Sequence, residues 1–307
     1  MRIKPKALKP GDTLAVVSPA SGIDPEKMHQ GLAVLHDAGF KTKLMPHVLD
    51  QEYYLAGNDE ARASDLMSAF SDPEVSAVYC SRGGYGCARL FPYLDLDKMV
   101  NSRKMLIGFS DITTLHMAWQ RRNGVSIHAP MALTLASQRE PWVYDSFLRL
   151  LVGDPVIADV VPKAEVVVPG IATGTLVGGC MILICDAMGT PEQIDTKGKI
   201  LVLEDVDENP HRVDAMMTHL LNAGVLQESA GVIVGEMTRT DERSDQTIGA
   251  KPWRDIVSER LIKAGVPSML MFPFGHMKQM LSIPLGITAR MDAERGTLTY
   301  LENPCDV

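Results

Sequence analysis

The sequence predicts an α/β protein with two domains. Short β-branched runs alternate with longer amphipathic stretches, which is the βαβ signature of a mostly parallel sheet. The length of 307 residues suggests two domains at about 150 residues each. From 138 to 172 the pattern changes to one helix and proline-punctuated extended pieces, typical of a linker. We expect an N-terminal α/β domain over 1–140, a linker over 141–172 and a smaller C-terminal α/β domain over 173–307.

The first half begins with an apolar strand over 13–21. A helix over 25–40 follows, because Met28, Leu32 and Leu35 recur at helical spacing and form its inward face. Two more strands are expected over 74–86 and 104–110, and a helix over 111–124. The second half again alternates strand and helix, with glycine at the junctions. Its segments are 174–190, 197–226, 230–238, 251–265 and 267–276.

Composition narrows the possible partners. The formal charge is −8 and no cluster of Lys and Arg stands out, which argues against a nucleic-acid surface and favours a small-molecule partner. The N-terminus lacks the apolar region of a signal peptide, and no later run approaches the ~18 apolar residues of a membrane span, so we expect a cytoplasmic protein. The cysteines form no CxxC pair and are expected to be buried thiols: Cys80, Cys87, Cys180, Cys185 and Cys305.

Ser110 lies where an apolar strand becomes a helix, in "GFSDIT". Such a turn can expose a nucleophilic hydroxyl and direct the next backbone N–H at an oxyanion. The match to G-x-S-x-G is partial, because Ile112 stands where the second glycine would be. From this stretch alone a helix N-cap is the favoured interpretation, since every helix needs a cap.

A serine nucleophile needs a histidine base and an acid that orients it. His276 directly follows a strand, in a glycine and proline turn, where α/β folds keep their sites. His128 stays a second candidate, while His47 sits in a probable loop. The others are expected to pack, cap a helix or face solvent: His29, His36, His116, His211 and His219.

The acid is Glu204 or Asp205, which end a fully apolar strand and need a partner if buried. Either could instead be a structural acceptor. The stretch "EDVDEN" lacks the glycine and terminal glutamate of a calcium loop, so no metal is expected. The glycine-rich turn over 81–86 could present N–H groups to an anion, but it carries neither G-x-G-x-x-G nor a P-loop lysine, and a nucleotide cofactor is poorly supported.

Six motifs in order give these residues a common interpretation: "VSPAS", "RGGYG", "GFSDIT", "LVGG", "LVLEDVDENPHRVDAMM" and "FGH…PLG". Together they resemble the L,D-carboxypeptidase family, serine peptidases that remove the terminal D-alanine from murein tetrapeptides in the bacterial cytoplasm and are related to the microcin C immunity peptidases. The resemblance spans about residues 13 to 300. It implies an N-terminal α/β domain carrying the serine, a C-terminal domain carrying acid and base, and an active site at their junction.

The resemblance also implies roles. The nucleophile is Ser110, the base His276 and the orienting acid Glu204, and the oxyanion hole is built from the N–H groups of Asp111 and Gly84. No cofactor is implied, and a homodimer is.

One departure from the family pattern is Cys180, where many members carry asparagine after the paired glycines. A carboxypeptidase must also hold the substrate's free carboxylate and, for murein stems, an ammonium group. The candidates are Arg82 for the carboxylate, Glu208 or Asp207 for the ammonium, and more loosely Arg212 and Arg239. Any of them could instead be a member of a surface ion pair.

Two alternatives remain open from sequence. An immunity-type amidase would cleave an acyl-sulfamoyl nucleotide and carry an extra loop with an aromatic for the base, whereas the segment 239–252 has no aromatic residue. A non-catalytic protein that binds a ligand between two domains would keep "RGGYG" without needing the serine, glutamate and histidine set.

Overall fold

The computed structural model describes residues 2–245, 247, 249 and 251–306, and the chain divides into two units. Gln246, Ile248 and Ala250, within the segment 239–252 discussed above, lie outside the described residues. Unit 1 comprises 1–156, 282–286 and 303–307, and unit 2 comprises 157–281 and 287–302. Each unit is built around its own sheet, which confirms the predicted two-domain α/β fold.

Unit 1 contains a six-stranded sheet in the order β11-β5-β4-β3-β1-β2. Its strands pair in parallel except for β11, which pairs antiparallel with β5. The strands are β1 (Thr13–Val17), β2 (Lys41–Leu44), β3 (Ala77–Cys80), β4 (Met105–Gly108), β5 (Ser126–His128) and β11 (Ile283–Leu285). The helices are α1 (Pro25–Asp37), α2 (Asp59–Ser71), η1 (Cys87–Tyr93), α3 (Leu96–Asn101), η2 (Ser110–Ile112), α4 (Thr113–Arg121), α5 (Ala132–Leu135) and α6 (Pro141–Leu151).

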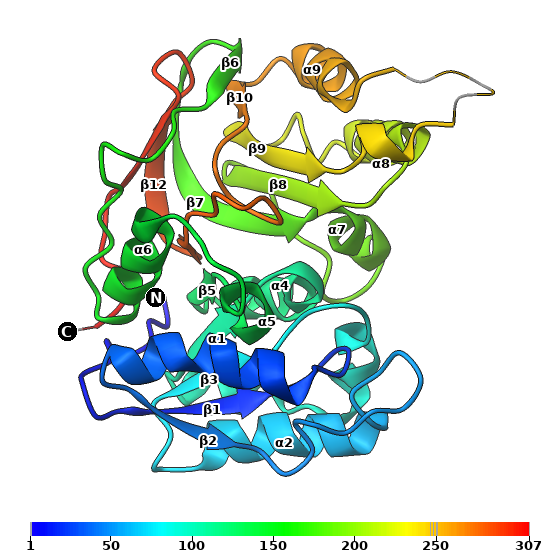
Figure 1. Ribbon diagram of the computed structural model, residues 1–307. Helices are drawn as coiled ribbons and strands as arrows, with labels where there is room; N and C mark the ends of the chain where they lie inside the picture. The colour runs from blue at the N-terminus through cyan, green and yellow to red at the C-terminus, as the bar shows by residue number, and fades with distance from the viewer. Residues whose placement is uncertain (1, 246, 248, 250, 307) are drawn as a thin grey trace. The chain divides into compact units, whose positions relative to one another are not determined.

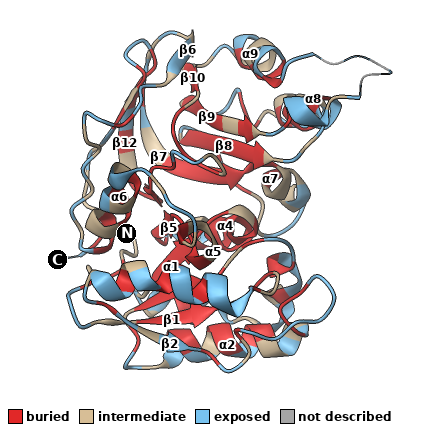
Figure 2. Cartoon of the chain, in the orientation of Figure 1, coloured by how far each residue is buried: buried red, intermediate tan, exposed pale blue. Residues whose placement is uncertain are grey.

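Helices cover both faces of this sheet because its inner strands β1, β3, β4 and β5 are buried on both sides. Alternate residues of β1, Leu14 and Val16, belong to the core cluster that also holds the inward residues of α1 and α6. The residues between them face α2, whose Phe70 ring packs at a tilt against Trp119 of α4, with 5.4 Å between the ring centroids. The burial map shows the result, with buried strands between helices whose outer faces are exposed (Figure 2).

The strand order places a topological switch point in unit 1. The chain runs from β1 outward to β2 and then back to β3 on the other side of β1, so the direction of winding reverses between β1 and β3. In open parallel sheets, ligands bind beyond the carboxyl ends of the strands at such a reversal. The loops that leave β1 and β3 meet there, since Ser21 N–H donates to Gly83 O at 3.4 Å.

Unit 2 contains a seven-stranded sheet in the order β13-β12-β7-β8-β9-β10-β6. The four strands β7 to β10 are parallel and are joined through helices, while β12, β13 and β6 are antiparallel to their neighbours. The helices pack in a row, α7 on α8 and α8 on α9 (Figure 1). The elements are β6 (Glu165–Val168), β7 (Ile171–Cys180), α7 (Met181–Ala187), β8 (Ile200–Val206), α8 (Pro210–Asn222), β9 (Gly231–Thr238), η3 (Asp241–Arg243), α9 (Trp253–Ala264), β10 (Ser268–Leu270), β12 (Thr288–Asp292) and β13 (Thr297–Tyr300).

The unit boundaries differ from the predicted domains of 1–140, 141–172 and 173–307. Helix α6 is not part of a linker, because Phe147, Leu150 and Leu151 are buried in the core of unit 1. Strand β6 pairs with β10 and so belongs to unit 2. The chain also returns to unit 1 late, when β11 adds to the edge of β5 and Asp306 pairs with Lys6 of the N-terminal segment.

Candidate active site

Ser110 adopts a strained backbone conformation at the carboxyl end of β4. Its φ is +63°, in the left-handed region that non-glycine residues rarely occupy, and this costs about 1–2 kcal/mol. No side chain caps η2 or α4 in this fully described stretch, so the N-cap interpretation is wrong. A strained residue that does not cap the helix is what a nucleophile elbow requires.

Gly83 packs directly against Ser110. A Cβ on Gly83 would lie 2.7 Å from Ser110 Cβ, 2.8 Å from its Oγ and 3.2 Å from Asp111 N, so only glycine allows this approach. Gly84, the residue predicted for the oxyanion hole, instead faces Ser21 in the loop after β1. Gly83 therefore lies against the serine. The N–H of the peptide that joins Gly83 to Gly84 belongs to Gly84.

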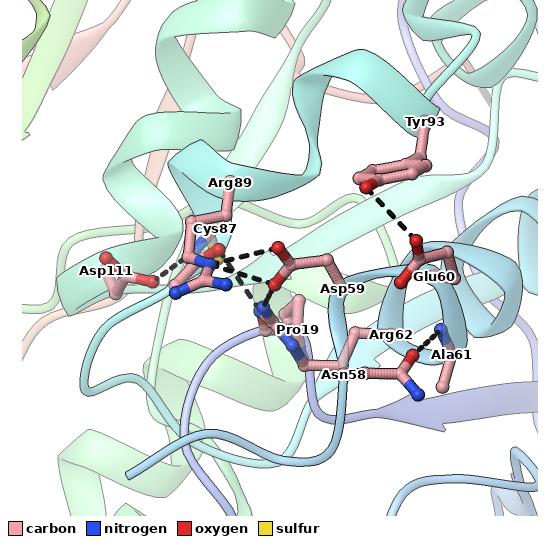
Figure 3. A network of polar contacts seen from close by, with 11 residues as sticks. Pro19, Asn58, Asp59, Glu60, Ala61, Arg62, Cys87, Arg89, Tyr93 and Asp111 are labelled. Carbon is pink, nitrogen blue, oxygen red and sulfur yellow. Dashed lines mark hydrogen bonds and ion pairs between the residues drawn. The ribbon is translucent and has the colours of Figure 1, made fainter. Parts of the chain in front are cut away.

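Asp111 is buried directly after the serine, with 2% of its surface exposed. Its carboxylate does not point into solvent, because Oδ2 accepts the backbone N–H of Cys87 at 2.8 Å (Figure 3). This bond ties the start of the helix after β4 to the end of the glycine-rich turn after β3. The two segments that could supply oxyanion N–H groups are thus fixed to each other.

His116 is hydrogen-bonded to the strand that leads to Ser110. Its Nε2 lies 2.9 Å from the carbonyl oxygen of Gly108, and its Nδ1 lies 2.8 Å from Ser126 Oγ on β5. Burial lowers the pKa of this histidine to about 4, so the ring is neutral at pH 7. The sequence placed His116 among packing or surface residues, and the structure shows it in the packed interior.

In unit 2, Glu204 and His276 form a close pair. Glu204 is fully buried near the end of β8, and its Oε2 lies 2.6 Å from His276 Nδ1 and accepts the His276 backbone N–H at 3.2 Å. The turn that carries the histidine crosses the glutamate, since a Cβ on Gly275 would lie 2.5 Å from Glu204 Oε2. A glycine before the histidine is therefore needed to seat the ring on the acid.

The carboxylate controls the charge of His276. Burial by itself lowers the pKa of this histidine, but the charge and hydrogen bond of Glu204 outweigh it, so the pKa is raised. Asp205 adds to the rise and Arg239 opposes it. Glu204 Oε1 has no hydrogen-bond partner among the described residues, so its Oε2 carries all the hydrogen bonds that hold the pair. Such a pair holds an imidazole in one orientation and stabilises its protonated form.

Asp205 is the second acid and faces away from the histidine. Its Oδ2 accepts the N–H of Ile182 at 2.8 Å, and its Oδ1 accepts the Cys180 thiol at 3.6 Å. Burial, reinforced by the charge of Glu204, raises the pKa of Asp205 to about 7. Cys180, at the position where many relatives have asparagine, thus donates to Asp205, and burial raises the pKa of its thiol well above the usual value.

The candidate substrate ligands differ in how they are engaged. Arg82 is half-buried and donates through Nε to Gly83 O and through Nη1 to Gly22 O, both at 3.2 Å. Among the described residues, Glu208 makes a single long ion pair, with Arg212, at 3.9 Å between Nε and Oε2. Asp207 is held by Arg239 and Arg243, whose hydrogen bonds and charges lower its pKa. Glu208 is therefore the less occupied of the two predicted carboxylates.

The remaining histidine candidates have other roles. His128 is fully buried on β5 and packs its ring 5.5 Å from that of Phe109. His47 Nδ1 lies 2.9 Å from Asp65 Oδ1 in a loop. Within the described residues, no three His, Cys, Asp or Glu side chains gather as a metal site. All five cysteines are free thiols, and all but the partly exposed Cys185 are buried.

Comparison with known families decides the family. The model described as the LD-carboxypeptidase N-terminal domain matches residues 14–129, and the model for the C-terminal domain matches residues 173–291. The chain belongs to the LD-carboxypeptidase family.

Relatives match this chain over nearly its whole length. A probable murein peptide carboxypeptidase of Bacillus subtilis is 34% identical over 310 residues, covering 97% of this chain and 94% of the relative. The murein tetrapeptide carboxypeptidase of Pseudomonas aeruginosa is 32% identical over 297 residues, covering 92% and 94%. The structure of MccF in complex with glutamyl sulfamoyl guanosine superposes with a TM-score of 0.86 at 19% identity, covering 99% of this chain and 100% of MccF.

These findings make the chain a carboxypeptidase by family, as predicted. The likeness to MccF is one of fold and does not favour a nucleotide substrate. None of the described helices is long and apolar enough to cross a membrane. Of the features that sequence reasoning missed, Gly83 could have been found from the doubled glycine of the turn. His116 gave no signal beyond its place on a helix.

Proposed function

We propose that this protein releases the terminal D-alanine of murein tetrapeptides through an acyl-enzyme formed on Ser110. The observation that carries the proposal is the positive φ of Ser110 at the end of β4, with Gly83 against its Oγ. The buried Glu204–His276 pair in unit 2 supplies the other two groups of the chemistry. The murein activity named for relatives that cover almost the whole chain supports the choice of substrate.

The proposed reaction follows the serine peptidase template. His276 uses Nε2 to take the proton of Ser110 Oγ as the oxygen attacks the carbonyl carbon of the bond before D-alanine. Glu204, bonded to Nδ1, stabilises the imidazolium. The N–H groups of Asp111 and Gly84 bind the oxyanion, and the imidazolium then protonates the departing amine of D-alanine. Water activated by the same histidine hydrolyses the acyl-enzyme.

Two side chains are proposed to bind the substrate. Arg82 takes the free carboxylate of D-alanine, because its backbone bonds use Nε and Nη1 and its Nη2 is the remaining donor nitrogen. Glu208 takes the ammonium of the diamino acid, since its bond to Arg212 is long and leaves it competent to accept a second cation. Cytoplasmic action on recycled murein peptides and a homodimer complete the proposal.

The test uses purified protein and synthetic stem tetrapeptides that carry lysine or diaminopimelate at the third position. Mass spectrometry should show the loss of one D-alanine from at least one peptide. Ser110→Ala should lower kcat by at least about 10⁴, leaving residual catalysis from binding and oxyanion contacts. Ser102→Ala, which removes another serine of the same unit that bonds Met99 O, is the control and should leave kcat unchanged.

A fluorophosphonate probe separates the enzyme from a ligand-binding protein, because it reacts only with an activated serine. Reaction at Ser110 without release of D-alanine from any stem peptide would refute the substrate and keep the nucleophile. Undiminished release by Ser110→Ala would refute the nucleophile.

A further inference from the structure

Arg62 is an arginine in the interior of unit 1. It lies on the inward face of α2 with 1% of its surface exposed, where a charged side chain is costly unless it is paired and hydrogen-bonded. Asp59, one turn earlier on the same helix, accepts from its Nη2 and forms an ion pair. The positive charge is thus kept in place by a carboxylate fixed to the same helix.

The other terminal nitrogen of Arg62 reaches two loops, while its Nε has no hydrogen-bond partner among the described residues. Its Nη1 donates to the carbonyl of Pro19, in the loop after β1, and to the carbonyl of Gly86 at 3.1 Å, at the end of the glycine-rich turn after β3 (Figure 3). These are the loops on either side of the strand reversal. A Cβ on Gly86 would lie 2.8 Å from Nη1, so the turn approaches the guanidinium as closely as glycine permits.

One peptide group connects Arg62 to the residue after the serine. The carbonyl of the peptide between Gly86 and Cys87 accepts from Arg62, and the N–H of the same peptide donates to Asp111 Oδ2 at 2.8 Å. The peptide is therefore bonded at both ends, to a buried cation and to a buried carboxylate. A shift of the guanidinium would be passed through this rigid unit to Asp111.

We propose that Arg62 is the positioning residue of the oxyanion hole, acting through the Gly86–Cys87 peptide on Asp111 and through the turn on Gly83 and Gly84. It holds the two segments whose N–H groups face the oxyanion at a fixed separation. Its positive charge also lies next to the Gly86–Cys87 peptide, which is hydrogen-bonded to the buried carboxylate of Asp111. Without that positive charge, the carboxylate would oppose the negative charge that develops on the oxyanion. The inference rests on the proposed function and names a part of its machinery that no substrate contacts.

The test compares Arg62→Lys and Arg62→Met with Arg89→Gln. Arg89 also pairs with Asp59, through Nε at 2.9 Å, but it is exposed and serves as the matched control. Lysine keeps the charge and can donate to the carbonyls, but it lacks the planar fork that serves two loops and Asp59 together. We expect Arg62→Lys to lower kcat by about tenfold to a hundredfold with KM unchanged, as expected for a misplaced catalytic group. Arg62→Met should lose more, and Arg89→Gln should match the wild type.

A second readout does not need the natural substrate: the rate at which a fluorophosphonate modifies Ser110, measured in the same folded variants. It should fall in Arg62→Lys and not in Arg89→Gln. If wild-type protein reacts with the probe but cleaves no stem peptide, the substrate is wrong and the ratio of probe rates still decides the role of Arg62. If wild-type protein shows neither reaction, both proposals fail.

Should Arg62→Met not fold, as judged by its thermal unfolding curve, the lysine variant carries the test. A folded Arg62→Lys with wild-type kcat and wild-type probe rate would overturn the inference. So would a change in KM alone, because that would place Arg62 in substrate binding.

Discussion

Replacing Glu204 by glutamine isolates the effect of one buried charge. Two donors, His276 Nδ1 and the His276 backbone N–H, point at the same carboxylate oxygen, Oε2. The amide oxygen of a glutamine would take this place, and its NH₂ would take that of Oε1, which bonds no described residue. The orientation and tautomer of the histidine are then kept, and only the negative charge is lost.

The size of the effect follows from the separation. With the charge centres about 4 Å apart and an effective dielectric constant of about 20, the attraction between carboxylate and imidazolium is about 4 kcal/mol. If that attraction is present in the transition state, Glu204→Gln should lower kcat by about a thousandfold. The pKa of His276 should fall as well, because Glu204 is what raises it, and the acid limb of kcat/KM should move to lower pH.

The assay combines steady-state release of D-alanine with NMR titration of the His276 ring, assigned by comparison with His276→Asn. Glu259→Gln is the control, since Glu259 pairs with Lys251, Arg260 and Lys263 in the same unit. A folded Glu204→Gln that loses less than tenfold in kcat, or keeps the raised pKa of His276, would refute the reasoning.

Three further predictions concern the surroundings of the site. Gly83→Ala should keep the fold and lower kcat at least about tenfold, because its Cβ would displace Ser110; circular dichroism with kinetics checks this, and wild-type kcat would contradict it. The pKa of His116 is lowered to about 4, so its neutral ring stabilises the protein above about pH 6.5 and up to about 3 kcal/mol is lost as pH falls toward 4. Denaturant unfolding across this range should show a flatter dependence for His116→Gln, and parallel curves would count against it. The pKa of Asp205 is raised to about 7, so its contribution is present below about pH 4 and lost as pH rises through 7. Relative to wild type, Asp205→Asn should be more stable at pH 8 than at pH 5 by about 3 kcal/mol. The same unfolding measurements should show no such difference if the reasoning fails.

The strands that carry the site could be predicted because their signals are local. The apolar runs that end at Ser110 and at Glu204 are short, unbroken and followed by turn residues, so both the strand and its carboxyl end can be recognised from sequence. The strain at Ser110 could not be predicted, because a serine before a helix is equally suited to a cap. Only the backbone conformation separates the two roles.

Two other features depend on contacts between distant segments. Arg62 shares the inward face of α2 with Leu66 and Phe70, but a charged residue is normally expected to face solvent, so sequence gives no reason to bury it. The return of β11 to the first sheet rests on three residues that pair with β5, more than 150 positions earlier. A strand this short contains too little hydrophobic pattern to predict the strand with which it pairs.

The late return of β11 has a consequence for cutting the chain. The chain passes from one unit to the other after Val156, Leu281, Gly286 and Glu302, so no single cleavage yields one complete unit. A fragment ending at Val156 would lack β11 and expose the hydrogen-bonding edge of β5, which invites pairing with other chains and aggregation. Limited proteolysis within unit 2 is therefore expected to release β11 from the edge of the sheet in unit 1. For this chain, a gene split at the apparent domain boundary would be a poor route to a working half.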